Sequence, residues 1–330
     1  MDIPYENSDR ARELAERTRK FMDDVVLPVE RDQTGGEPVS DAVLSDLREQ
    51  AREYDIYCPQ MPEEYGGMGV DFRDALPVFE EAGRSLLGAP ALRVDAPDEG
   101  NMHTLEMLGT DRQKEEWLAP LVAGEATSAF SMTEPQPGAG SDPKMLQTTA
   151  ERDGDEWVID GHKWWTSGGD EADILIVMAR TDMDAHPYEG CSLFLVPRDT
   201  PRVDVVRNIP ALDGDMVELD HAEIRYEDVR VPEQALLGHE NEGFSHAQAR
   251  LRPARLTHCM RFCGMAERAL TVARTYLTER EAFGSSLSEK QELRHRIAER
   301  ETHLHGARTM VRHAARKVAA GEQARVETAI

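Results

Sequence analysis

The sequence has 330 residues, a length that suits two or three packed domains better than one minimal domain. Apolar residues make up 40% and charged residues 31%, so we expect a folded chain and not a disordered one. Lys and Arg together number 38 and Asp and Glu 63, and the resulting net charge of −25 repels nucleic acid and anionic lipid, which excludes both as bulk partners.

Residues 1–127 are predicted to form an N-terminal helical domain. Ser8 and Asp9 can cap a helix whose apolar residues recur every three or four positions up to Val26, and Pro28 predicts its end. Further helices are expected over Ser40–Ala51, Ala75–Ser85 and Met102–Leu108.

Residues 128–237 change to short β-branched runs and are predicted to form a central β-domain. Asp153-Gly154 and Asp160-Gly161 flank Trp157-Val158-Ile159, as tight turns flank a strand. Strands at this spacing indicate a compact antiparallel sandwich or barrel and not alternating βα units. Further strands are expected over Ile174–Ala179, Ser192–Val196, Val203–Val206 and Ala222–Val231.

Residues 238–330 return to the helical period. One apolar stripe runs from Met260 to Leu277, Phe283-Gly284-Ser285 breaks it, and an amphipathic helix follows from about Ser288 to Ala320. Two long helices cannot bury their apolar faces alone and need further helices or another subunit. The predicted fold class is therefore α+β multidomain: an all-α N-terminal domain, a central antiparallel β-barrel or sandwich, and an incomplete C-terminal helical bundle.

The charge is spread unevenly along the sequence. Residues 251–330 carry a net charge of +6 and residues 1–250 a net charge of −31. The basic segment suits the phosphates of a cofactor or substrate, but its arginines can also pair with acids of neighbouring helices, and both interpretations stay open. Only 6 lysines against 32 arginines in so acidic a chain is typical of adaptation to high salt or of an ordinary acidic enzyme.

Neither a disulfide scaffold nor a metal site is expected. The cysteines, at positions 58, 191, 259 and 263, form no Cys-x-x-Cys or zinc-finger spacing, and the eleven histidines form no obvious ligand set. No apolar run approaches the roughly 18 residues that span a bilayer, and the N-terminus lacks the basic and apolar blocks of a signal peptide. We therefore expect a cytoplasmic protein with no membrane partner.

Two segments of the β-domain have the composition of a ligand site. Phe130–Asp142 is rich in glycine, proline and hydroxyls, so its backbone N–H groups can approach a planar or anionic ligand, although an ordinary structured loop fits equally well. In Lys163–Gly169 two adjacent tryptophans should point to opposite faces of a strand, so that one is core and the other can lie flat on a ring system. That both are core residues is the alternative.

Taken together, the order of these motifs resembles the acyl-CoA dehydrogenase family over essentially the whole chain. The motifs are Thr133–Asp142, Asp153–Trp165 and Arg280-Glu281-Ala282-Phe283-Gly284. One branch of the family, whose mammalian members carry an added kinase-like domain, is especially similar in three segments: Ala96–Met102, Lys163–Trp165 and Leu256–Arg261. The resemblance implies a helical domain, a β-domain and a helical bundle, a place in fatty acid metabolism, and FAD as cofactor.

The resemblance also assigns roles to individual residues. Six residues of the β-domain would line the FAD: Phe130, Met132, Thr133, Trp165, Thr166 and Ser167. Ser141 would lie against the cofactor and the CoA thioester. Three residues would reach FAD held mainly by a neighbouring subunit: Arg280, Phe283 and Gln291. Arg252 and Arg255 would meet the CoA moiety of the substrate.

No catalytic base can be named from the resemblance. These enzymes need a carboxylate to remove the α-proton while hydride leaves the β-carbon for flavin N5. Most members place it near their C-terminus, beyond the last residue of this sequence, and others place it on the first long helix of the last domain, where Ala254 stands. The catalytic residue stays unknown, and we expect this chain by itself to be a weak catalyst or inactive.

The implied function is FAD-dependent α,β-dehydrogenation of an acyl-CoA to the 2-enoyl-CoA, with electrons passed to an electron-transfer flavoprotein, in a homodimer or homotetramer. FAD is expected and not FMN, because the contacts of Arg280 and Gln291 need a dinucleotide. Two alternatives stay open. One is a flavin oxidase or monooxygenase on the same scaffold, and the other is a catalytically silent acyl-CoA- or flavin-binding protein.

Overall fold

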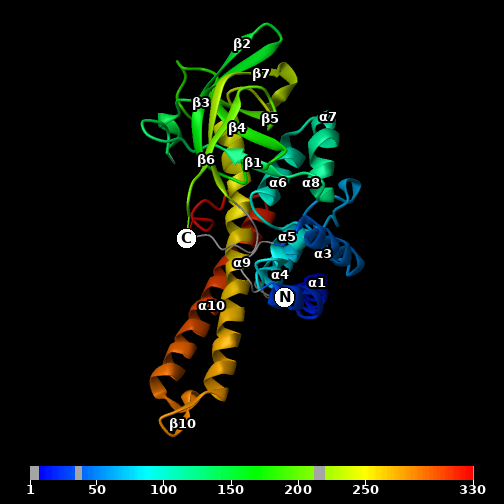
Figure 1. Cartoon of the computed structure of the whole chain (residues 1–330), viewed down its shortest axis with the longest axis vertical. Coiled ribbons are helices and arrows are strands. Elements are labelled where there is room, and N and C mark those ends of the chain that lie inside the picture. The colour runs from blue at the N-terminus through cyan, green and yellow to red at the C-terminus, as the bar shows by residue number, and fades with distance from the viewer. Residues whose placement is uncertain (1–6, 34–38, 141, 212–219, 330) are drawn as a thin grey trace. The chain divides into compact units, whose positions relative to one another are not determined.

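The computed structural model describes residues 7–33, 39–140, 142–211 and 220–329. Its helices gather at the two ends of the sequence and its main sheet in the middle, which confirms the predicted fold class (Figure 1). Two compact units are present. The helical unit comprises Met1–Pro62, Gly67–Val94 and Arg252–Ile330, and the sheet unit comprises Glu63–Gly66 and Asp95–Leu251.

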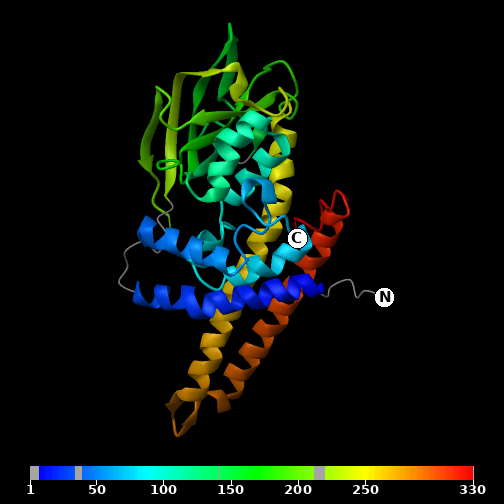
Figure 2. The same ribbon diagram turned by 90° about the vertical axis from the view of Figure 1, so that its right-hand side faces the viewer.

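The helical unit begins with a helix that continues past its predicted end. Helix α1 (Asp9–Phe21), capped by the Ser8 hydroxyl, continues through a π-helical turn (η1, Met22–Val26) into α2 (Leu27–Asp32), as Figure 2 shows. The expected end at Pro28 is wrong. The proline stands in the first turn of α2, and the π turn before it lets the Leu27 amide bond the Met22 carbonyl.

Two glycines allow helices of this unit to cross closely. Helices α3 (Asp41–Glu53), α4 (Phe72–Ala82) and α5 (Gly88–Leu92) follow α1 and α2. A Cβ atom on Gly83 would lie 2.0 Å from the carbonyl oxygen of Arg261, and one on Gly264 would lie 1.8 Å from that of Glu80. Only glycine fits at either position, so α4 packs backbone to backbone on α9 (Gly243–Glu279).

The two long C-terminal helices lie side by side in both views (Figures 1 and 2). A hairpin of β9 (Glu281–Ala282) and β10 (Ser285–Ser286), with the short turn η6 (Leu287–Glu289), connects α9 to α10 (Gln291–Ala319). Cys263, Leu270 and Leu304 pack between them. Large apolar side chains remain exposed on α9, so the expectation that these two helices leave apolar surface uncovered is confirmed: Phe262, Met265, Val272 and Tyr276.

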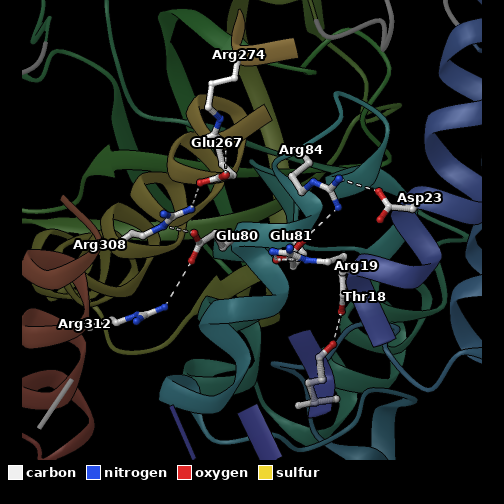
Figure 3. A network of polar contacts seen from close by, with 11 residues as sticks. Thr18, Arg19, Asp23, Glu80, Glu81, Arg84, Glu267, Arg274, Arg308 and Arg312 are labelled. Atoms are coloured by element: carbon white, nitrogen blue, oxygen red, sulfur yellow. Dashed lines mark hydrogen bonds and ion pairs between the residues drawn. The ribbon is translucent and has the colours of Figure 1, made fainter. Parts of the chain in front are cut away.

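A network of ion pairs joins α1, α4, α9 and α10 within the helical unit (Figure 3). Arg308 donates to Glu80 and, over 2.9 Å, to Glu267, while Arg19 donates to Glu81 over 2.6 Å. Three arginines of the C-terminal segment therefore pair with acids of neighbouring helices, which is one of the two interpretations left open above: Arg274 with Glu301, Arg308 with Glu267, and Arg312 with Glu80.

The sheet unit contains short helices and one eight-stranded sheet. The helices are η2 (Glu63–Tyr65), α6 (Asp98–Leu108), α7 (Asp111–Gln113), η3 (Lys114–Leu118) and α8 (Ala119–Ala123), with two short turns, η4 (Pro143–Met145) and η5 (Glu233–Ala235). The strands are β1 (Ser128–Ser131), β2 (Thr149–Asp153), β3 (Glu156–Ser167), β4 (Ile174–Arg180), β5 (Cys191–Pro197), β6 (Val203–Asn208), β7 (His221–Pro232) and β8 (Leu236–Leu237).

The strand order is β6-β7-β3-β2-β4-β5-β8, and β1 pairs with β4. Most pairs are antiparallel, as predicted, but β1 runs parallel to β4 along its whole length. Trp157 on β3 is the core tryptophan of the sheet, and its ring meets that of Phe194 edge to face at 5.2 Å. Among the described residues, no helix combines the length and the hydropathy that a membrane-spanning segment needs.

Candidate functional site

The loop after β1 meets the end of β3 inside the sheet unit. The Trp164 amide donates a hydrogen bond of 3.0 Å to the Thr133 carbonyl, and the hydroxyls of Ser131 and Thr166 lie 3.3 Å apart. These contacts bring together the two groups of residues that sequence analysis assigned to a flavin. Phe130, Met132 and Thr133 are half-buried beside them.

A bulge in β3 sets the positions of the two adjacent tryptophans. The register of β3 against β7 shifts between Lys163 and Thr166, and Trp165 adopts the left-handed backbone conformation with φ of +54°. The two indole rings therefore contact each other edge to face at 6.1 Å, and the expectation of opposite faces is wrong. Trp165 is 43% exposed, so neither tryptophan is a fully buried core residue.

The bulge leaves hydrogen-bonding capacity unused. The Nε1 of Trp164 is buried and has no hydrogen-bond partner among the described residues. The Thr133 hydroxyl likewise makes no hydrogen bond with any other described residue. Unused donors beside an exposed indole fit a planar, polar-edged ring system such as a flavin.

His221 supports the far end of the bulge. Its Nδ1 lies 2.9 Å from the Ser167 hydroxyl, and its ring lies 5.6 Å from the Trp165 ring. Thr166 is fully buried, so the structure exposes none of its atoms to a bound cofactor. Sequence analysis missed His221 because it lies 54 residues from Ser167 and reaches it only through the pairing of β3 with β7.

A buried ion pair holds the loop after β1. Lys163 donates to the Met132 carbonyl over 2.9 Å and to the Glu134 carboxylate over 3.0 Å, and both side chains are buried. Burial lowers the pKa of Lys163 to about 8, against the attraction of Glu134. Burial opposes ionisation of Glu134 as well, but the charge of Lys163 and hydrogen bonds from Thr148 hold its pKa below the ordinary value.

Glu134 also fixes the chain on both sides of the loop. It accepts hydrogen bonds from the Ala139, Gln147 and Thr148 amides at 3.1, 2.7 and 2.9 Å. Glu134 and Lys163 lie within the motifs Thr133–Asp142 and Lys163–Gly169, but neither residue was assigned a role from the sequence. The sequence feature that could have revealed this ion pair is one charged residue inside each of two stretches that are otherwise apolar or rich in glycine. Ser141 lies outside the described residues.

The remaining candidate residues belong to the helical unit. Phe283 is 97% exposed at the tip of the β9–β10 hairpin, where its φ is +54°, and Arg280 and Gln291 flank the hairpin on the surface. Arg252 donates to the Gln323 side chain over 3.2 Å, and Arg255 is exposed. The side chain at position 254 is a buried methyl group, which cannot remove a proton.

Comparisons with known proteins agree with this architecture. Models of the acyl-CoA dehydrogenase N-terminal, middle and C-terminal domains match residues 8–125, 129–229 and 241–330. The Mycobacterium tuberculosis protein named "Probable acyl-CoA dehydrogenase FadE2" is 39% identical over 323 residues, which are 95% of this chain and 78% of that protein.

Two further comparisons concern a mammalian relative and a solved structure. Acyl-CoA dehydrogenase family member 11 of Mus musculus is 35% identical over 310 residues, and the matched region covers 89% of this chain but only 39% of the mouse protein. A glutaryl-CoA dehydrogenase from Mycobacterium smegmatis, solved in complex with FADH2, superposes with a TM-score of 0.81 at 26% identity. That match covers 97% of this chain and 79% of the other.

Proposed function

The chain belongs to the acyl-CoA dehydrogenase family, and we propose that it catalyses FAD-dependent α,β-dehydrogenation of an acyl-CoA thioester to the 2-enoyl-CoA, with electrons passing to an electron-transfer flavoprotein. The observation that carries the proposal is the contact between the loop after β1 and the bulge of β3, made by the Trp164 amide and the Thr133 carbonyl. It supports a single flavin site built from both segments.

FAD, when bound, supplies the acceptor for a hydride from the substrate β-carbon. The Thr133 hydroxyl and the amides near it donate hydrogen bonds to the ring edge that gains negative charge on reduction, which is where fixed donors stabilise most. Trp165 covers the ring with its exposed indole. The Glu134–Lys163 pair keeps the loop in place, so that these donors need not reorganise during the reaction.

The same proposal gives five residues of the helical unit roles in binding CoA or FAD. Arg252 and Arg255 take the phosphates of CoA, which suits arginines with few protein partners. Arg280, Phe283 and Gln291 contact FAD held by a second copy of the chain, in a dimer or tetramer. An exposed phenylalanine in a left-handed conformation is costly in a lone chain, and a partner surface explains why the position carries one.

One observation favours a second candidate function. Removal of the α-proton needs a base, and Ala254 cannot supply one. Alanine at position 254 is consistent with a protein that binds FAD and acyl-CoA but does not oxidise the thioester. We keep this catalytically silent binding protein as the alternative.

Anaerobic titration of the FAD-loaded protein with acyl-CoA thioesters tests the proposal. Bleaching of the flavin absorbance, followed by reduction of an added electron-transfer flavoprotein, is the expected result. Peroxide formation in air without transfer to that flavoprotein would indicate an oxidase. Binding of both FAD and acyl-CoA without bleaching would establish the silent binding protein.

The site residues are tested by a matched pair of variants. Loss of one hydrogen bond to the cofactor in Thr133→Val should weaken FAD binding about tenfold. Thr149→Val makes the same change on β2, outside the proposed site, and should leave FAD binding unchanged. Equal effects of the two substitutions would contradict the assignment of Thr133.

A further inference from the structure

A buried arginine stacks on one of the proposed flavin-lining residues. Arg250 lies in the first part of α9, inside the sheet unit, and is only 8% exposed. The carbon at the centre of its guanidinium group lies 4.4 Å from the centroid of the Phe130 ring. Its Nε donates to the Asn101 side chain over 2.9 Å, and a second nitrogen approaches the Pro97 carbonyl at 3.4 Å.

The residues that hold Arg250 also hold the strand that carries Phe130. Asn101 donates to the Ser128 hydroxyl over 2.9 Å, and the amide and hydroxyl of Ser128 both donate to the Asp98 carboxylate, at 2.7 and 2.5 Å. Ser128 and Phe130 are two residues apart on β1 and therefore face the same side of the strand. Strand β1 is thus held at two points on the same side: at Ser128 by hydrogen bonds, and at Phe130 by the contact of its ring with Arg250.

The surroundings fit a planar guanidinium group. A Cβ atom on Gly100 would lie 3.0 Å from the central carbon of that group, so α6 leaves the space that the group fills. Burial lowers the pKa of Arg250 to about 10, against the attraction of Glu99 and Asp98, and the side chain therefore keeps its positive charge at neutral pH. A cation with so little water around it interacts more strongly than a surface cation.

We propose that Arg250 is a positioning residue of the flavin site, which holds the Phe130 ring against the cofactor and sets a buried positive charge behind it. This inference rests on the proposed function, because it assumes that FAD binds beside Phe130. Reduction gives a flavin additional negative charge, and a nearby cation favours the reduced form. Arg250 therefore raises the midpoint potential of the bound FAD.

A second arginine of the sheet unit provides the control. Arg152 stacks on Trp157 at 4.3 Å, almost the same distance, but it is exposed and pairs with Glu233 and Glu240 on the surface. Replacing either arginine by lysine removes the guanidinium group from above the ring and keeps the charge. Only the Arg250 substitution should change the affinity and the spectrum of the bound FAD.

The test measures the dissociation constant, visible spectrum and midpoint potential of FAD in the full chain. Arg250→Met should shift the midpoint potential to a more negative value. Arg250→Lys should keep the potential near that of the wild type, change the flavin spectrum and weaken FAD binding about tenfold, the upper range for a desolvated cation–π contact. Arg152→Lys should change none of the three.

The effect on FAD affinity must also depend on the Phe130 ring. In a Phe130→Leu background, Arg250→Lys should cost much less affinity than in the wild type, because the contact through which it acts is gone. Should Arg250→Met fail to fold, Arg250→Lys and this double-mutant cycle still decide the question.

Variants that lower the melting temperature but keep the wild-type potential, spectrum and FAD affinity would overturn the inference and leave Arg250 a structural clamp between α9 and α6. FAD binding by the wild-type protein is measured first. Its absence would overturn the proposed function, and the inference with it. Retained FAD binding with unchanged Arg250 variants would overturn the inference alone.

Discussion

The Lys163 ammonium group and the Glu134 carboxylate lie 3.0 Å apart with almost no exposure to water, and Glu134 belongs to the loop that follows β1. Removal of one partner from such a pair leaves the other charge buried without compensation. We predict that Lys163→Met lowers the free energy of unfolding by about 3–5 kcal/mol, measured by urea unfolding. The double variant Lys163→Met, Glu134→Gln should recover part of that loss, and a double variant as unstable as the sum of both changes would contradict the coupling.

The network in Figure 3 leads to a prediction for the helical unit. Glu80 accepts from Arg308, and Arg312 lies 3.7 Å from its second oxygen, with all three side chains partly or largely buried. Glu80→Gln should lower the free energy of unfolding by about 1.5–3 kcal/mol, the range for hydrogen bonds to charged groups.

Glu292 offers the control for that substitution. It pairs with Arg296 on the exposed face of α10, four residues along the same helix. Glu292→Gln should change the free energy of unfolding by less than about 0.5 kcal/mol. Similar losses for the two variants would show that the network is no stronger than an ordinary surface pair.

The pH dependence of stability should reflect His246, which is 6% exposed in the first turns of α9. Burial lowers its pKa below the ordinary value of 6.5, Glu242 opposes that shift and His239 adds to it. Below pH 6.5 the unfolded chain then binds a proton that the folded chain does not, so stability falls as the pH falls towards the folded pKa.

His246→Gln should remove this part of the acid destabilisation. The measurement is the difference in urea midpoint between pH 7.5 and pH 5.5 for both proteins, which cancels the other titrating groups. A wild-type protein that loses no more stability than the variant over this interval would contradict the assignment.

The sequence predicted most elements because their signals are local. Ser8 caps α1 as expected, the helix expected from Ser40 is α3, and Asp153-Gly154 stands at the turn between β2 and β3. The turn expected at Asp160-Gly161 is wrong, because both residues lie inside β3, where the register against β7 shifts between Ile159 and Gly161. The helix end predicted at Pro28 is wrong because a π-helical turn precedes the proline and lets the helix continue. Such a turn has no reliable sequence signal.

The geometry of the candidate site was less predictable. The side chains of β3 stop alternating between the two faces of the sheet at Trp165, because a bulge interrupts the strand there. Nothing in the pair Trp164-Trp165 predicts that Trp165 adopts the left-handed backbone conformation. The stack of Arg250 on Phe130 joins residues 120 positions apart, so no spacing rule reveals it. The motifs identified which segments form the site, but the contacts between them come from tertiary packing.

Phe283 provides a prediction in which stability and cofactor binding change in opposite directions. Asparagine tolerates the left-handed conformation better than phenylalanine, so Phe283→Asn should raise the free energy of unfolding of the FAD-free protein by about 0.5–1 kcal/mol. The same variant should release FAD faster, because the proposed contact with FAD of a second copy is lost. Unchanged FAD release with the expected gain in stability would remove Phe283 from the proposed site.

The proposed function depends above all on one site, in which the loop after β1 and the bulge of β3 together bind FAD. The most direct measurement is to release the cofactor from the purified protein by heat and to identify it against FAD and FMN standards, for the wild type and for Trp165→Ala. We predict FAD from the wild type and much less of it from the variant, whose exposed indole is missing. FMN, or a well-folded wild-type protein that takes up no flavin even when FAD is supplied, would contradict the account.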